Sequence, residues 1–244
     1  MNIEIKLADV KIRISLCLPD TKKYFSKFIT QEECSGWDVR VEDEDIHRYP
    51  LICPSGVLDA FSEAYLLIPH VSAFLLKHGC VLIHGVSFVW NAQSWLITAP
   101  SGIGKTTQFH HLQSILGDEI ELINGDKTIL SLNKKGQFWL HPSPWMGKEK
   151  ECGSISGQLA GIIILEQETV NSISLLSPRE SVLQVFQQIL VADSSEEELM
   201  EAGEMESMLL DTIPVWRLKN CGDIDSAHLM IQTIEEYGKK TKKI

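Results

Sequence analysis

The 244-residue sequence predicts an α/β fold in which a mixed β-sheet is flanked by helices. Three observations predict this class. Short apolar segments typical of strands recur from residue 81 to residue 219, and amphipathic segments with helical spacing separate several of them. Two strand pairs joined by short turns, at 81–98 and 128–140, interrupt a regular alternation of strand and helix. Because hairpins place neighbouring strands antiparallel, the sheet should be mixed rather than purely parallel.

The first 55 residues are predicted to form a small β-rich subdomain, and residues 56–244 the main domain. Apolar and polar residues alternate over the first 20 residues, which predicts a β-hairpin. One further strand is expected at 37–41. Apolar side chains at helical spacing over 58–78 predict a helix that Pro69 interrupts, giving a helix, a kink and a second helix.

The main domain begins with a strand at 81–90, a turn, and a second strand at 94–98. A glycine-containing loop then leads into an amphipathic helix that ends at Gly117. Four strand elements follow: a strand at 120–124, the 128–140 hairpin, a buried strand at 161–166 and a strand at 172–176. A helix then runs from the capping box Ser177–Glu180 to Val191, and a second helix, capped by Ser194 or Ser195, runs to about Leu210. A strand at 215–219 and a helix at 224–237, closed by Gly238, complete the domain.

The net charge of −11 excludes several classes of partner. An acidic surface repels phosphate backbones and anionic lipids, so we expect neither a nucleic acid nor a membrane as partner. The amino terminus lacks the apolar core of a signal peptide, and no apolar stretch reaches the ~20 residues of a membrane helix. The six cysteines are scattered without a CxxC pair, which is typical of reduced thiols in a cytoplasmic protein.

Residues 99–106, with the sequence APSGIGKT, fit the phosphate-binding pattern GxxxxGK[ST] (Walker A), except that Ala99 takes the first glycine position. In such a loop, backbone N–H groups and the positive end of the following helix bind phosphates, the lysine reaches the β- and γ-phosphates, and the hydroxyl ligates Mg²⁺. The expected nucleotide-binding residues are Ser101, Gly102, Ile103, Gly104, Lys105, Thr106 and Thr107. The alternative is an ordinary glycine turn. The apolar strand before the loop and the amphipathic helix after it favour nucleotide binding.

Asp126 follows the strand 120–124, about 20 residues after the phosphate-binding loop. A carboxylate at this place can hold Mg²⁺ or take a proton from an attacking hydroxyl, so Thr106 and Asp126 are the expected metal ligands. The alternative is a turn-forming aspartate. His84, on an earlier strand, is a candidate to support the acid or contact the acceptor, although a histidine on a strand is more often a core residue.

The loop at 141–150 is the third candidate feature, because it combines stiff prolines, one aromatic residue and lysines. Loops of such irregular composition often carry function. Trp145 and Lys148 are its candidate substrate-contacting residues. The alternative, given equal weight, is a solvated connection between strands.

The segments IHGV (83–86), APSGIGKTT (99–107) and NGDK (124–127) together resemble the catalytic domain of bacterial HPr kinase/phosphorylase, a family of the phosphoenolpyruvate-carboxykinase-like superfamily. The resemblance implies catalytic roles for three residues. Lys105 and its loop would bind ATP, Asp126 would act as base on a serine hydroxyl, and His84 matches the active-site histidine of the family. The family has two adjacent acids where this chain has Gly125 and Asp126.

The short chain also resembles stand-alone members of this group, including lasso-peptide kinases that phosphorylate a serine of a precursor peptide. We therefore expect a Mg²⁺-dependent kinase that transfers the γ-phosphoryl group of ATP to a serine of a peptide or small protein. A homo-oligomer is possible by the same resemblance. The alternatives are a small-molecule kinase, for example one acting on free serine, and a non-catalytic ATP-binding regulatory module.

Overall fold

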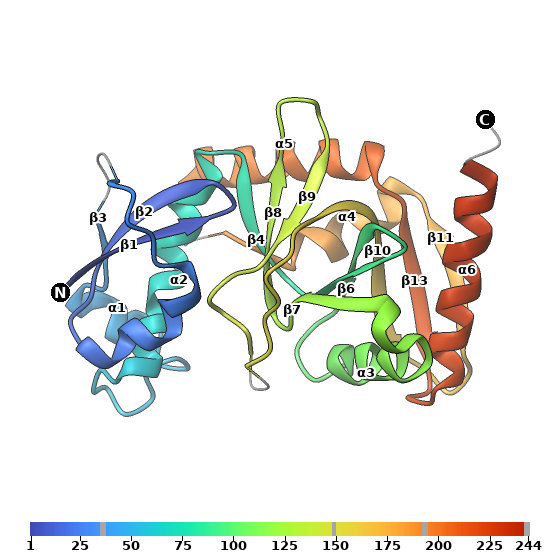
Figure 1. Cartoon of the computed structure of the whole chain (residues 1–244), viewed down its shortest axis with the longest axis horizontal. Helices are drawn as coiled ribbons and strands as arrows, with labels where there is room; N and C mark the ends of the chain where they lie inside the picture. Colours follow the sequence, from blue (N-terminus) through green and yellow to red (C-terminus); the bar gives the residue numbers. More distant parts are fainter. Residues whose placement is uncertain (35–37, 148–149, 192–194, 242–244) are drawn as a thin grey trace.

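The computed structural model describes the whole chain except residues 35–37, 148–149, 192–194 and 242–244. It is a mixed α/β fold, as predicted: a large mixed sheet flanked by helices, with a separate three-stranded sheet near the amino terminus. Figure 1 shows the amino-terminal elements at one end of an elongated molecule and the last helix at the other end. The large sheet lies between them.

The amino-terminal sheet consists of β1 (Asn2–Leu7), β2 (Val10–Ser15) and β3 (Asp38–Arg40). Strands β1 and β2 pair antiparallel, which confirms the predicted hairpin, and β3 joins β2 in parallel. A 3-10 helix, η1 (Pro19–Phe28), and a short helix, α1 (Asp43–Arg48), complete this region. Residue 37 of the predicted third strand lies outside the described residues.

Helix α2 (Ala60–Leu76) runs unbroken through Pro69, so the predicted division into two helices is wrong. The lost hydrogen bond at proline is offset by burial, because Leu66, Leu67, Val71 and Leu75 are all fully buried. The core around this helix takes in side chains of the amino-terminal sheet and of the large sheet alike. The predicted domain boundary at residue 55 stays a prediction.

The described residues place ten strands in the large sheet. They are β4 (Cys80–His84), β5 (Val86–Trp90), β6 (Gln93–Thr98), β7 (Ile120–Asn124), β8 (Lys127–Leu132), β9 (Phe138–His141), β10 (Gly157–Gln167), β11 (Ser172–Leu176), β12 (Ile189–Leu190) and β13 (Val215–Asn220). Their order is β12-β4-β8-β9-β10-β6-β5-β7. Strand β13 pairs with β10 on the edge opposite β6, and β11 pairs with β13. The neighbours β6, β10 and β13 are parallel, so their carboxyl ends meet at one edge.

The strand predicted at 81–90 is in fact two strands, β4 and β5, which separate at Gly85. A Cβ atom at Gly85 would lie 2.6 Å from the carbonyl oxygen of Ile97, so the backbone passes too close for any side chain. Beyond this point β5 pairs with β6 and β7, whereas β4 pairs with β8 and β12. The break therefore places His84 at the end of a strand.

In the described part of the chain, four helices that follow the phosphate loop flank the large sheet: α3 (Lys105–Leu116), α4 (Pro178–Phe186), α5 (Glu196–Thr212) and α6 (Asp225–Thr241). The capping box at Ser177 is present, and Ser195 caps α5 through its side-chain oxygen. Two predicted ends are wrong. Helix α4 stops at Phe186 because Ile189 and Leu190 pair with β4 as strand β12. Helix α6 continues past Gly238, because a glycine inside a helix costs only about 1 kcal/mol of helix stability.

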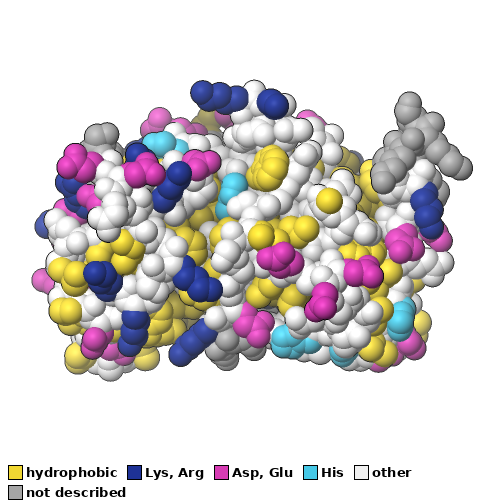
Figure 2. All heavy atoms as spheres, in the orientation of Figure 1, with side chains coloured by type: hydrophobic (Ala, Val, Ile, Leu, Met, Phe, Trp, Pro, Cys, Tyr) yellow, Lys and Arg dark blue, Asp and Glu magenta, His cyan; other side chains and the backbone are white. Residues whose placement is uncertain are grey.

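Charged side chains of both signs are interspersed over the face shown in Figure 2. Within the described part of the chain, no helix is long and apolar enough to cross a bilayer. All six cysteines are free thiols, and Cys34, Cys53 and Cys80 are buried.

Candidate active site

The phosphate-binding loop connects β6 to α3, as the sequence predicts. Gly102 and Gly104 have φ angles of +85° and +102°, in the region where only glycine is unstrained. Helix α3 begins at Lys105, and its first N–H groups have no partner within the helix. They are directed to the loop together with the positive end of the helix dipole, which is the arrangement that binds phosphate.

Lys105 is nearly buried, with 8% of its surface exposed. Its Nζ donates hydrogen bonds to the carbonyl oxygens of Ala99 (2.8 Å) and Pro100 (3.2 Å), at the start of the same loop. Burial lowers the pKa of Lys105 below its ordinary value of 10.5, and Lys127 lowers it further while Asp126 opposes the shift. The ammonium group is thus poorly solvated and held at the loop, where an anionic ligand would stabilise it.

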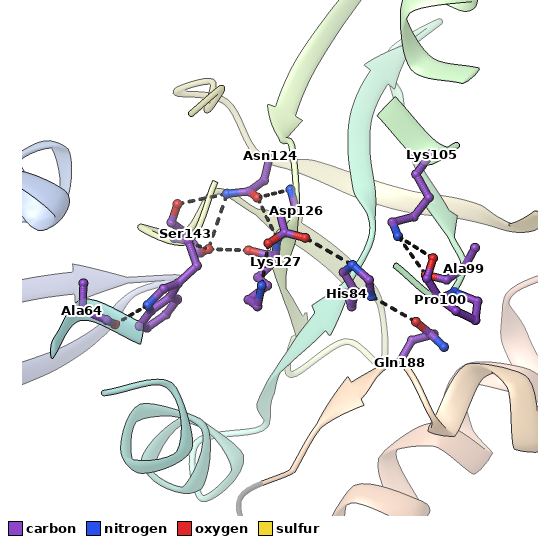
Figure 3. Close-up of polar contacts among 11 residues, drawn as sticks. Ala64, His84, Ala99, Pro100, Lys105, Asn124, Asp126, Lys127, Ser143 and Gln188 are labelled. Atoms are coloured by element: carbon purple, nitrogen blue, oxygen red, sulfur yellow. Dashed lines mark hydrogen bonds and ion pairs between the residues drawn. The ribbon is translucent and has the colours of Figure 1, made fainter. Parts of the chain in front are cut away.

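Asp126 is the centre of a charged cluster with His84 and Lys127, shown in Figure 3. Its Oδ1 lies 3.2 Å from Nε2 of His84, and its Oδ2 accepts a hydrogen bond from Nζ of Lys127 at 2.5 Å. Burial raises the pKa of Asp126, but the hydrogen bond with His84 and the charge of Lys127 outweigh burial, so the pKa lies below its ordinary value of 3.8. The carboxylate is therefore ionised at neutral pH.

The other ring nitrogen of His84 faces Gln188, with Nδ1 3.2 Å from Oε1. If both contacts are hydrogen bonds as drawn, the two ring nitrogens both donate, because a carboxylate and an amide oxygen are acceptors only. A neutral His84 keeps both contacts only if the Gln188 amide is turned to offer its NH₂ group. Strand β12 holds Gln188 in place, since the His84 N–H donates to its carbonyl oxygen at 2.8 Å.

The backbone on either side of Asp126 is fixed by the turn that it belongs to. Oδ1 of Asn124 accepts hydrogen bonds from the N–H groups of Asp126 (2.9 Å) and Lys127 (3.0 Å). The N–H of Gly85 donates to the carbonyl oxygen of Asp126 at 2.7 Å, and Asn124 in turn donates to the carbonyl oxygen of Ser143 at 2.9 Å. Asp126 therefore lies in a hydrogen-bonded turn, and the same turn fixes the position of its carboxylate.

One cavity of about 730 Å³ brings the predicted residues together. Its lining includes eight of the residues that the sequence predicts for the site: His84, Ser101, Gly102, Gly104, Lys105, Thr106, Thr107 and Asp126. The predicted Ile103 lies outside this cavity and lines a neighbouring one. A larger cavity, of about 1080 Å³, lies elsewhere, between the β1–β2 turn and the β8–β9 hairpin, and the phosphate loop does not line it.

Sequence reasoning missed several residues of this cavity. Lys127 carried a signal, because it adjoins Asp126, but Gln188 lies far along the chain and only the β4–β12 pairing brings it near. Phe61 and Tyr65 come from α2, where they looked like ordinary core residues of an amphipathic helix. Nζ of Lys127 lies 5.2 Å from the ring centre of Tyr65, and burial together with Asp126 raises the pKa of Tyr65 to about 12. Its phenol therefore stays neutral.

The loop at 141–150 does not present Trp145 to the cavity. The indole is 1% exposed, its Nε1 donates to the carbonyl oxygen of Ala64 at 2.7 Å, and its ring packs edge-on against Phe25. It has no exposed surface with which to touch a substrate in this conformation. Lys148 lies outside the described residues. Gly147 of the same loop does line the cavity, beside Asp126.

The predicted Mg²⁺ ligands fit a weakly chelated ion. Thr106 and Asp126 line the same cavity and offer a hydroxyl and a carboxylate oxygen, both hard ligands of the kind that Mg²⁺ prefers. The described residues contain no group of three or more His, Cys, Asp or Glu side chains that could hold a metal by themselves. Mg²⁺ in phosphotransfer sites typically takes one or two protein ligands and completes its shell with phosphate oxygens and water.

No protein-family model matches the chain, and no curated protein matches it. Among solved structures, the chain is similar to the Hpr(Ser) kinase/phosphatase from Coxiella burnetii, at 12% sequence identity and a TM-score of 0.38. The match covers 66% of this chain and 98% of that chain. We therefore derive the function of this chain from the residues of the site.

Proposed function

We propose that the chain is a P-loop phosphotransferase that moves the γ-phosphoryl group of ATP to a serine hydroxyl of a peptide or small protein. One observation carries the proposal: Lys105 of the phosphate loop and the His84–Asp126–Lys127 cluster line the same cavity. A phosphate-binding loop alone would fit any nucleotide-binding protein. An ionised carboxylate facing that loop adds the group that a transfer reaction needs at the acceptor side.

The phosphate end of the nucleotide would be held by charge. The first N–H groups of α3 and the positive end of its dipole supply fixed donors, and Lys105 supplies a cation that ordinary hydration stabilises only partly at this buried place. These groups need no rearrangement of solvent as negative charge develops on the bridging oxygen of the departing ADP, and such preorganised donors typically stabilise a transition state more than the ground state.

At the acceptor end, the serine oxygen forms a new bond to the γ-phosphorus while the bond from that phosphorus to the β–γ bridging oxygen breaks and ADP leaves. The hydroxyl proton passes to the Asp126 carboxylate, which His84 orients through its contact with Oδ1. In a loose transition state the serine oxygen has formed little of its new bond and keeps its proton until late in the transfer. A carboxylate with a lowered pKa is therefore a strong enough base to receive that proton. Lys127 would screen the negative charge of Asp126 from the approaching phosphate.

Thr106 and Asp126 are the residues that would hold Mg²⁺. The ion, when bound, neutralises charge on the β- and γ-phosphates. Both Asp126 oxygens already contact a cationic or donor group, so Asp126 would give the ion at most one of its remaining lone pairs.

The aromatic surface of the cavity supports a peptide or small protein, rather than a free amino acid, as the acceptor. Phe61 is 49% exposed and stacks on Tyr65 with ring centres 4.5 Å apart, which places an open aromatic surface beside Asp126. A bare amino acid would leave this apolar surface in water, whereas the residues that flank a serine in a peptide would cover it. Lys127 places its positive charge at the same wall of the cavity.

The acceptor class is tested by transfer of labelled γ-phosphate in the presence of Mg²⁺ to free serine, to short peptides that contain serine, and to an HPr-like protein. The proposal expects label on a peptide or protein serine. Label on free serine alone would favour the small-molecule kinase. ATP binding without transfer to any acceptor would favour the regulatory module.

A further inference from the structure

A second cavity, of about 440 Å³, adjoins the first across the phosphate loop. Gly102, Gly104 and Thr107 line both cavities, so the loop forms a wall that they share. The volume lies within the range of small-ligand pockets. One side of the loop thus faces Asp126 and His84, and the other side faces a separate space.

This second cavity lies at the carboxyl edge of the three parallel strands. The phosphate loop follows β6, Gln167 and Glu168 stand at the end of β10, and Asn220, Cys221 and Gly222 stand at the end of β13. In α/β sheets, small ligands bind outside the carboxyl ends of parallel strands, because loops from neighbouring strands converge there. The position is therefore one where a ligand is expected.

The wall formed by α3 contains two buried polar atoms that have no hydrogen-bond partner among the residues that the structure describes. Gln108 is 2% exposed, and its Oε1 accepts a hydrogen bond from the Ser226 hydroxyl at 2.8 Å, but its Nε2 has no hydrogen-bond partner among the described residues. Nδ1 of His111, one turn further along the helix, is also buried and unpartnered within that part of the chain. A buried amide without a partner loses its hydrogen bonds to water and gains none in return, so such groups usually meet a ligand or water.

We infer that this cavity binds the nucleoside half, the base and ribose, of the nucleotide whose phosphates lie in the loop. The inference rests on the proposed function, because the cavity next to Asp126 must receive the γ-phosphate and the acceptor. The nucleoside then leaves the loop on its other side, where Gln108 offers an amide donor to the base. Glu168 and Asn220 offer a carboxylate and an amide at the ends of the neighbouring strands, suited to hydroxyl and base-edge groups.

The test compares ATP with inorganic tripolyphosphate, which carries the phosphates without the nucleoside, by calorimetric titration with Mg²⁺. Two variants alter the second cavity. Cys221→Trp fills it from its exposed rim, and Gln108→Leu removes the amide at similar volume. Val170→Trp is the control for an exposed tryptophan on the neighbouring turn, and Ser226→Ala is the control for loss of the Ser226–Gln108 hydrogen bond.

Wild-type protein is expected to bind ATP at least 10-fold more tightly than tripolyphosphate. Both cavity variants should weaken ATP binding 10-fold or more and leave tripolyphosphate within about twofold, while the controls match wild type. ATP binding that is unchanged in Cys221→Trp, or that falls in parallel with tripolyphosphate, would place the nucleoside elsewhere and leave the proposed function standing. If Gln108→Leu does not fold, Cys221→Trp decides alone. Wild-type protein that binds neither compound would overturn both proposals.

Discussion

Nε2 of His84 lies 3.2 Å from Oδ1 of Asp126, and the register of two strands sets this distance. Strands β4 and β8 pair antiparallel with His84 directly opposite Lys127, the residue after Asp126. A slip by one residue would turn His84 to the other face of the sheet. The contact is therefore as well defined as the sheet itself, and it joins a residue before the phosphate loop to one after it.

Asp126→Asn should lower phosphoryl transfer by about 10²–10⁴-fold, because the amide cannot accept the hydroxyl proton. ATP affinity measured without Mg²⁺ should change by less than about threefold, since Lys105 and the loop backbone are untouched. Steady-state transfer and calorimetry on the same preparation check both statements. Asp118→Asn, at an exposed residue, is the matched control. Equal losses of binding and transfer in Asp126→Asn would argue for a structural role only.

Lys105→Met should lower transfer by at least about 100-fold and weaken ATP binding, because the site loses the cation that faces the phosphates. The long apolar side chain keeps the packing of the buried stem. Lys135→Met, at an exposed turn position, is the control and should behave as wild type. Transfer that survives in Lys105→Met would mean that the loop does not hold the reacting nucleotide.

Gln188→Leu should lower kcat about 10-fold with little change in KM for ATP, because His84 loses the partner that orients its ring. Gln188 is a positioning residue, so a conservative change should rescue it. Gln188→Glu keeps an oxygen opposite Nδ1 of His84 and should recover most of kcat, again with little change in KM for ATP. No recovery in Gln188→Glu would show that packing alone, rather than the hydrogen bond, is at stake.

Gly147→Ala should impair catalysis by displacing Asp126. A Cβ atom at Gly147 would lie 2.9 Å from Cβ of Asp126, and the φ angle of +77° adds backbone strain of about 1 kcal/mol. Gly136→Ala is a matched control, because Gly136 has a φ of +74° and open space around the added atom. We expect similar losses of thermal stability from the strain, but a further several-fold loss of kcat for Gly147→Ala. Equal kcat values in the two variants would contradict a tight fit between Gly147 and Asp126.

Glu206→Gln should stabilise the protein above neutral pH. Glu206 is 3% exposed on α5, burial raises its pKa to about 7, and its Oε1 has no partner among the described residues. Because the folded pKa exceeds the unfolded one, the folded state holds an extra proton between about pH 4.5 and 7, and stability falls as pH rises through this window.

Urea unfolding at pH 5 and pH 8.5 measures this effect. The wild type should lose roughly 1–3 kcal/mol between the two values relative to Glu206→Gln, which cannot ionise. Glu201→Gln, at an exposed position of the same helix, should retain the wild-type pH dependence. Parallel pH dependences in Glu206→Gln and wild type would mean that Glu206 titrates normally.

Local signals in the sequence were enough to predict the hairpins, the phosphate loop, the capping box at Ser177 and the buried strand β10. They failed where a tertiary contact decides the outcome. Gly85 breaks a continuous apolar segment because Ile97 lies against it, and Ile189 and Leu190 leave the helical pattern because β4 offers a pairing edge. Neither partner is near in the sequence, so no window of residues reveals it.

The same reason explains which residues of the candidate site could be predicted from the sequence and which could not. Lys105 and Thr106 follow from a contiguous motif, and Asp126 from a strand end at a typical distance. Gln188, Phe61 and Tyr65 reach the cavity only through the packing of β12 and α2. Trp145 was predicted to contact substrate from the composition of its loop, but composition does not distinguish an aromatic residue that anchors a loop from one that faces a ligand.

We propose that the phosphate loop and Asp126 act together as one phosphotransfer site. The most direct test follows γ-labelled ATP, Mg²⁺ and a serine-containing acceptor peptide through one turnover, with wild-type protein, Lys105→Met and Asp126→Asn in parallel. We expect label on serine with wild type, none above background with Lys105→Met, and ATP bound but not transferred with Asp126→Asn. Label transferred by Asp126→Asn at the wild-type rate, or ATP bound by the wild type without any transfer, would contradict it.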